Sequence, residues 1–219
     1  MKQFAVIGMG NFGFYAATRL YDRGHDVLAV DRSESRIEEV KDGVSQAVVA
    51  DATEIKALEA LEMDRMDAVI ISIGSVLAHS ILAALNLNDL GVKQIHAKVL
   101  SEAHGRILRK IGVHEILFPE KDIAVSLAER LHNPNMIDYL PFIEGYTIFQ
   151  FTPPTAFIGK SLRELNMINR FGVQVLAIKK AGPVRYEMIP TGEYSLAPSD
   201  RMVILGPEGA LDDFGEETD

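Results

Sequence analysis

The sequence contains no cysteine among its 219 residues. Without thiols the chain can form no disulfide, hold no metal through thiolates and use no cysteine nucleophile. The six histidines do not replace them, because no two stand at a spacing typical of zinc ligands. The Gly-x-Ser-x-Gly turn of serine hydrolases and the complete Walker A pattern of P-loops are missing as well. These absences exclude several large classes of enzyme.

Basic residues are also in the minority. There are 22 Lys and Arg against 31 Asp and Glu, and the formal net charge is −9. An acidic chain has no long-range attraction to nucleic acid or anionic lipid, so we expect no nucleic-acid partner. The start, "MKQFAVIG", lacks the layout of a signal peptide, which favours a cytoplasmic protein.

One stretch has no charge at all. No Asp, Glu, Lys or Arg stands between Asp67 and Asp89, and this run is long enough to suggest a membrane span. Its pattern favours two elements instead. The β-branched run "AVIISI" ends at Gly74-Ser75, and the Ala/Leu-rich run "VLAHSILAALNL" follows. We expect a buried strand and then a buried helix.

The first 130 or so residues alternate between short apolar runs and amphipathic segments. We expect strands at 3–8, 26–31, 45–50, 67–73, 94–99 and 114–118. Helices are expected at 11–23, 33–41, 51–61, 76–90 and 101–112, and another from Pro119 to about 131. This α/β alternation predicts a Rossmann-like, doubly wound parallel sheet of strand order 3-2-1-4-5-6.

The character of the chain then changes. The stretch "LHNPNMIDYLPFIEGY" is rich in Pro, Asn and Gly, which is typical of a linker or hinge. Short strands, hairpin-like turns and the helix "KSLRELN" follow, and together they predict a small α+β domain. We therefore expect a first domain at 1–134, a hinge at 135–145 and a second domain at 146–219.

The clearest motif lies in "VIGMGNFG", where Gly8, Gly10 and Gly13 form Gly-x-Gly-x-x-Gly between a strand and a helix. Gly8 permits a tight turn, Gly10 lets a phosphate approach the backbone, and Gly13 lets the helix pack against the strand. The helix that begins near Asn11 would direct its free N–H groups at the anion. Asp31, 18 positions after Gly13, ends the second strand, where a carboxylate binds ribose hydroxyls. The sequence therefore predicts a nucleotide site.

Other candidate residues leave alternatives open. Asp31 favours NAD or an adenine nucleotide over NADP, although Arg32 could receive a 2′-phosphate or be an ordinary exposed charge. Asp51 and Thr53 in "ADAT" could flank the adenine or cap the next helix. Gly74 follows the fourth strand at the ligand crevice and could equally be a turn glycine.

Several motifs together resemble the KtrA/TrkA family. They are "VIGMGNFG", "VLAVD", "ADAT", "VIISIG", "LRKIGVHEILFPEKDIA" and, in the second domain, "IGKSLRELN", "GVQVLAIKK" and "DRMVILG". The family consists of cytosolic gating subunits of potassium uptake systems, built from a nucleotide-binding RCK domain and a small TrkA-C domain. By position, the resemblance assigns the nucleotide site to Gly8, Gly10, Asn11, Phe12, Gly13, Asp31, Arg32, Asp51, Ala52, Thr53, Ile73, Gly74 and Lys98.

The resemblance also implies a function. ATP, ADP or NAD(H) would change the shape of a ring of homodimers, with an octamer expected. That ring would act on a membrane potassium channel or transporter at the inner face of the plasma membrane. Glu120 matches a position that helps to hold a divalent cation in some members, and relatives bind cyclic di-AMP at positions equivalent to 157–175 and Pro190. Where many members have an arginine after the second glycine, this chain has Asn11, which brings no charge and favours NAD(H) or AMP-type ligands.

Two other functions would use the same fold. A small NAD-dependent oxidoreductase would need an acid or base beside the nicotinamide, and none is evident; His79, in particular, is expected to be a core histidine. A redox-sensing DNA-binding regulator would need a basic helix-turn-helix, which the chain lacks. Apolar positions on two helices are either oligomer contacts or ordinary core: Ile107, Leu108, Ile111, Ile123 and Leu127.

Overall fold

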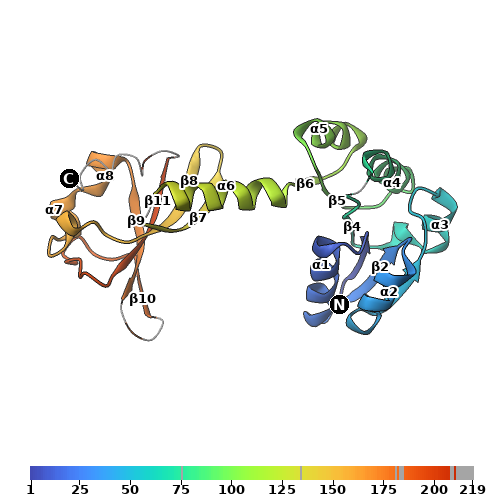
Figure 1. Cartoon of the computed structure of the whole chain (residues 1–219), viewed down its shortest axis with the longest axis horizontal. Coiled ribbons are helices and arrows are strands. Elements are labelled where there is room, and N and C mark those ends of the chain that lie inside the picture. The colour runs from blue at the N-terminus through green and yellow to red at the C-terminus, as the bar shows by residue number, and fades with distance from the viewer. Residues whose placement is uncertain (75, 134, 181, 183–184, 208–209, 211–219) are drawn as a thin grey trace. The chain divides into compact units, whose positions relative to one another are not determined.

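The computed structural model describes residues 1–74, 76–133, 135–180, 182, 185–207 and 210. The chain divides into two compact units, Met1–Glu120 and Lys121–Asp219. Each unit is described by itself below, with the element labels of Figure 1.

The first unit is built around a six-stranded parallel sheet of order β3-β2-β1-β4-β5-β6. This is the predicted doubly wound order, so the predicted fold class is confirmed. The strands are β1 (Gln3–Ile7), β2 (Asp26–Asp31), β3 (Gln46–Val49), β4 (Ala68–Ile71), β5 (Ile95–Lys98) and β6 (Glu115–Leu117). The helices between them are α1 (Asn11–Asp22), α2 (Glu34–Val40), α3 (Ile55–Ala60), α4 (Leu77–Asp89) and α5 (Glu102–Ile111), and α6 (Pro119–His132) follows β6.

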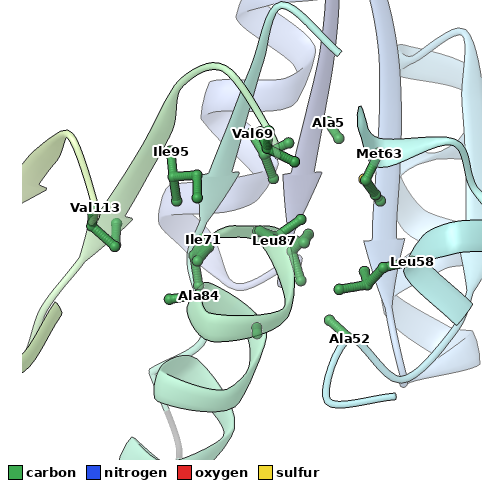
Figure 2. Packing of buried hydrophobic residues seen from close by; sticks show 14 of the residues in the cluster. Ala5, Ala52, Leu58, Met63, Val69, Ile71, Ala84, Leu87, Ile95 and Val113 are labelled. Atoms are coloured by element: carbon green, nitrogen blue, oxygen red, sulfur yellow. The ribbon is translucent and has the colours of Figure 1, made fainter. Parts of the chain in front are cut away.

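Successive residues of the central strands enter two different apolar layers, because side chains alternate between the faces of a strand. Val6 packs in a cluster with residues of α1 and α2, whereas Ile7 belongs to the larger cluster with α3, α4 and α5. Figure 2 shows part of the larger cluster, in which Leu87 of α4 and Val69, Ile71 and Ile95 of the sheet belong to the same apolar layer. Both faces of the sheet are therefore covered, as a parallel sheet requires.

The uncharged run forms the buried strand β4, as expected, and the helix α4, which is buried on one side only, because Leu77, Leu82 and Leu85 are exposed. Ala83, Ala84 and Leu87 are buried on the sheet-facing side of α4. Across the described part of the chain, no helix combines the length and low polarity that a membrane crossing would require.

The five apolar positions on α5 and α6 that could be core or oligomer contacts fall into two groups, buried and exposed. Leu108 is fully buried and Ile111 packs against the core of the first unit, so these two are core residues. Ile107, Ile123 and Leu127 are exposed, with 42%, 69% and 48% of their surface accessible.

The second unit contains a five-stranded antiparallel sheet of order β10-β9-β11-β8-β7 (Figure 1). Its elements after α6 are β7 (Met136–Ile143), β8 (Tyr146–Phe151), α7 (Leu162–Leu165), α8 (Met167–Phe171), β9 (Gln174–Lys180), β10 (Arg185–Met188) and β11 (Arg201–Pro207). Phe149, Phe151 and Phe157 are among its fully buried side chains. This agrees with the predicted small α+β domain; its last residues, 211–219, lie outside the described residues.

The segment predicted as a hinge, 135–145, contains β7. This strand pairs with β8 and shifts register between Met136 and Asp138 and again between Pro141 and Ile143. A proline is tolerated there because β7 is an edge strand. Of the residues that suggested a linker, Pro141 lies within this strand, at its second register shift.

The helix α7 begins with a complete capping box. Ser161 Oγ accepts a hydrogen bond from the Glu164 amide, and the Glu164 carboxylate accepts one from the Ser161 amide. These bonds satisfy amides that a helix start leaves without a partner.

Candidate functional site

The three glycines of the first turn have three different surroundings. Gly8 has a φ of +96°, and a Cβ atom there would lie 2.9 Å from the backbone of Ser72. A Cβ atom on Gly13 would lie 1.9 Å from the Gly8 carbonyl oxygen. Around Gly10, by contrast, no atom of the described residues, its two chain neighbours apart, lies within 4 Å of the Cβ position. Gly8 and Gly13 are therefore required by the fold, whereas Gly10 leaves open space that a ligand can enter.

The amino end of α1 faces this space. Gly10 is the N-cap residue, and no side chain caps the helix. The first turn contains no acidic residue that would compete with an anion. The positive end of the helix dipole and the amides of Asn11 and Phe12 are thus available to a phosphate.

Asp31, at the end of β2, holds the glycine turn in place. Its buried carboxylate accepts hydrogen bonds from the Met9 amide at 2.6 Å and the Ser33 amide at 2.8 Å. Arg36 Nη1 lies 3.5 Å from the same carboxylate. Since a carboxylate offers about four lone-pair sites, one remains for a ribose hydroxyl. Asp31 therefore both shapes the turn and can bind a ligand.

The segment after β3 forms a turn around Asp51. Its Oδ1 atom accepts hydrogen bonds from the Thr53 amide at 2.9 Å and the Thr53 hydroxyl at 2.8 Å. These bonds are the main reason that the pKa of Asp51 is lowered, with smaller effects of His79 and Arg32. The alternative that Asp51 or Thr53 caps the next helix is wrong, because the N-cap residue of α3 is Glu54.

Lys98 and Glu120 form an ion pair at the far side of the site. Lys98 ends β5, and Glu120 lies in the first turn of α6. The hydrogen bond from Lys98 is the main reason that the pKa of Glu120 is lowered. Within the described residues, no three His, Cys, Asp or Glu side chains gather to hold a metal ion.

These elements enclose a pocket of about 420 Å³ at the carboxyl edge of the parallel sheet. All the predicted site residues line it except Gly13, which lies beneath the turn. Lining residues that the sequence analysis did not assign to the site are Ile7, Arg36, Ala50, Ser72 and His79.

Two of these additional residues change the earlier interpretation. His79, expected in the core, is partly exposed and lines the pocket from the first turn of α4, so that expectation is wrong. The sequence could have predicted this position of His79, because the first helical turn after a strand lies at the ligand edge of this fold. Arg36 lies in the first turn of α2, and a helix that starts directly after β2 begins at the ligand edge of this fold, which could have suggested that Arg36 faces the ligand.

The pocket combines groups suited to a nucleotide. Arg32, Arg36 and Lys98 supply positive charge, and the glycine turn supplies backbone amides. Asp31 supplies an acceptor for sugar hydroxyls. The open position at Gly10 has the shape that a phosphate close to the backbone requires, so the residues present fit a nucleotide.

Comparisons with known proteins agree with this geometry. A family model described as the TrkA-N domain matches residues 4–119, and one described as the TrkA-C domain matches residues 146–218. The Ktr system potassium uptake protein A of Vibrio alginolyticus is 36% identical over 212 residues, which cover 96% of this chain and 94% of the relative. The chain belongs to the Ktr/TrkA family.

Another family member is the Ktr system potassium uptake protein A of Bacillus subtilis. It is 34% identical over 216 residues, which cover 99% of this chain and 96% of the relative. Among solved structures, the GsuK channel bound to NAD has a TM-score of 0.66 at 17% identity. This chain is covered completely in that match but spans only 39% of the channel's chain, so the likeness concerns the fold.

Proposed function

We propose that this chain is the nucleotide-binding regulatory subunit of a potassium uptake system. In this proposal a nucleotide binds at the glycine turn and controls a membrane potassium transporter or channel. The observation that carries it is the open position at Gly10, which lies at the uncapped amino end of α1 and lines the pocket. Family membership supplies the link to potassium uptake.

The ligand that we propose is an adenine nucleotide, either NAD(H) or ADP/ATP. Asp31 would accept hydrogen bonds from the ribose, and the amides of Asn11 and Phe12 would bind phosphate. The turn around Asp51, with Ala52 and Thr53, lines the pocket next to β3, where an adenine would lie. Asn11 brings no charge toward a terminal phosphate, which favours NAD(H) or AMP-type ligands over ATP.

The assembly that we propose is a ring of homodimers at the cytoplasmic side of the plasma membrane, where the transporter lies. The exposed apolar residues Ile107, Ile123 and Leu127 are candidates for contacts between copies. A divalent cation near Glu120 and cyclic di-AMP in the second domain are further proposals from family resemblance. The nucleotide must bind one conformation of the ring better than another, since a ligand of equal affinity for both shifts nothing.

A thermal-shift panel tests the site, with ATP, ADP, AMP, NAD, NADH, NADPH and cyclic di-AMP as ligands. A ligand at one hundred times its Kd adds about 2.7 kcal/mol of stability. We expect a clear shift with NADH or an adenine nucleotide and no turnover of that ligand. Potassium uptake by cells that carry the partner transporter should then depend on this chain and be altered by Gly10→Ala. A shift with NADPH alone, together with turnover, would instead support the oxidoreductase.

A further inference from the structure

Two fully buried polar side chains, one on α4 and one on α5, lack hydrogen bonds. The Oγ atom of Ser80 and both ring nitrogens of His104 are shielded from solvent and have no partner among the described residues. Ser80 lies in the first turn of α4, and His104 lies in the first turn of α5. Such groups are uncommon in folded proteins, because burying a polar group without a hydrogen bond costs free energy.

The packing of the two helices places these side chains at the same level. The helices α4 and α5 contact each other and cover the same face of the sheet (Figure 1). They run parallel, because each connects two neighbouring parallel strands. At their carboxyl ends the Asn88 side chain lies against Gly112, where a Cβ atom would be 2.8 Å from Asn88 Oδ1. Ser80 lies as far before Asn88 as His104 lies before Gly112, about two turns in each case.

The charged groups of the two helices lie away from His104. On α4 the titratable residues are His79, which lines the pocket, and Asp89, at the opposite end of the helix. The charged residues of α5 itself are all exposed: Glu102, Arg106, Arg109 and Lys110. His104 is therefore enclosed by the uncharged sides of both helices.

The strands beneath the helices supply no counter-charge either. The described strand β4 has no titratable residue. On β5, Ile95 and Ala97 belong to the apolar cluster with α4 and α5, so the alternating His96 and Lys98 point to the other face of the sheet. There His96 pairs with Glu115 of β6, and Lys98 pairs with Glu120.

A proton on His104 would make this packing unfavourable. The charged ring has two N–H donors, and the one hydroxyl at this level can accept from only one of them. His104 is also the third residue of α5, and its amide donates to the cap residue Ser101, so the ring lies near the positive end of the helix dipole. Burial lowers the pKa of His104 below its ordinary value.

We propose that His104 is a proton-sensitive contact, whose protonation separates the first turns of α4 and α5 and displaces the start of α4 from the edge of the pocket. The same first turn of α4 carries His79, which lines the pocket. The effect on a ligand rests on the proposed nucleotide site, whereas the proton-sensitive contact itself does not. A bound ligand that holds the start of α4 in place should in turn oppose protonation, since coupling is reciprocal.

The direction of the pH effect follows from the two states of His104. In the open state the ring is in water and has a pKa of about 6.5, whereas in the closed state its pKa is lower. The contact is therefore stable above about pH 6.5 and loses stability as the pH falls below that value. The equilibrium constant for opening should rise roughly 10-fold between about pH 7.5 and about pH 5.5.

Hydrogen–deuterium exchange of the full chain without ligand tests the contact. The quantity measured is the opening constant in the first two turns of α4 and α5, corrected for the intrinsic pH dependence of amide exchange. Wild-type protein should show the roughly 10-fold rise on acidification. His104→Leu and His104→Gln, which cannot take up this proton, should show almost none. Comparing two pH values within each variant removes any general change in its stability.

His96→Gln is the matched control, because His96 titrates on the opposite face of the sheet and outside the pocket lining. It should keep the wild-type rise. NAD at one hundred times its Kd should then reduce the acid-driven opening by up to about 100-fold, because only the closed state holds the start of α4 at the pocket.

Three results would overturn the proposal. The first is wild-type exchange that does not rise on acidification, and the second is an equal rise in both His104 variants. The third is opening that bound NAD does not reduce, which would refute the connection with the pocket. Failure of the wild-type chain to bind NAD is a different result: it would count against the nucleotide site, and the exchange without ligand would still decide the role of His104.

Discussion

Gly13→Ala should lower the stability of the first unit, whereas Gly10→Ala should lower nucleotide affinity, although the two glycines are only three residues apart. A methyl group on Gly13 would lie 1.9 Å from the Gly8 carbonyl oxygen, so helix or turn must move by at least about 1 Å. Such overpacking costs about 3 kcal/mol, and the better helix propensity of alanine returns about 1 kcal/mol. We expect a loss of about 2 kcal/mol, which lowers the melting temperature of the first unit by about 8 °C.

A methyl group on Gly10 meets no described residue within 4 Å apart from its chain neighbours. The backbone there, with φ −71° and ψ −178°, is accessible to alanine. The unfolded chain loses some entropy and the helix cap becomes slightly poorer, so stability should stay within about 0.5 kcal/mol of the wild type. The methyl group occupies the space that a phosphate needs. We therefore expect the affinity for ADP or NAD to fall by at least about 10-fold.

Circular-dichroism melts and titration calorimetry measure both effects on the same preparations. Gly10→Ala with wild-type affinity would refute the placement of the phosphate at this turn. Gly13→Ala with the wild-type melting temperature would refute the close approach of α1 to the turn.

Three further predictions concern single side chains. Burial and the hydrogen bond to Asp200 raise the pKa of Tyr194 to about 12. Its contribution to stability is therefore complete below about pH 10 and is lost as the pH rises toward 12. In thermal melts across this pH range, Tyr194→Phe should lose less stability than the wild type. An unchanged pH profile would contradict the raised pKa of Tyr194. Ser161→Ala removes the capping box of α7 and should lower the unfolding free energy of the second unit, measured in urea, by about 1 kcal/mol. Nucleotide affinity should not change; a loss of binding free energy of the same size would contradict the independence of the second unit from the nucleotide site. Asp31→Asn replaces one carboxylate oxygen with an amide that cannot accept the Met9 or Ser33 bond, so unfolding free energy should fall by about 1–3 kcal/mol, and an unaltered melt would contradict its role in holding the turn.

Much of the first unit follows from local patterns in the sequence. The strand order could be predicted because apolar runs and helical segments alternate regularly and the glycine motif lies in the first turn. The steric roles of Gly8 and Gly13 followed from the same motif, and their surroundings agree with those roles. Pro119 opens α6 as expected, since proline suits the first turn of a helix.

Features that depend on packing were harder to predict. Arg36 and His79 line the pocket because their helices start there with a particular rotation, which the sequence pattern does not specify. Leu108 and Ile107 are neighbours in an amphipathic helix, yet one is buried and the other exposed. The edge strand β7 was obscured by Pro141, which favours turns but is tolerated at a sheet edge, and by the turn-forming Asn135 just before the strand.

The most direct test of the account is a crystal structure of the full chain with ADP or NAD at saturating concentration. The account predicts phosphates at Gly10, against the amides of Asn11 and Phe12, and ribose hydroxyls on the Asp31 carboxylate. A nucleotide bound elsewhere on the chain, or no bound nucleotide at saturation, would contradict it.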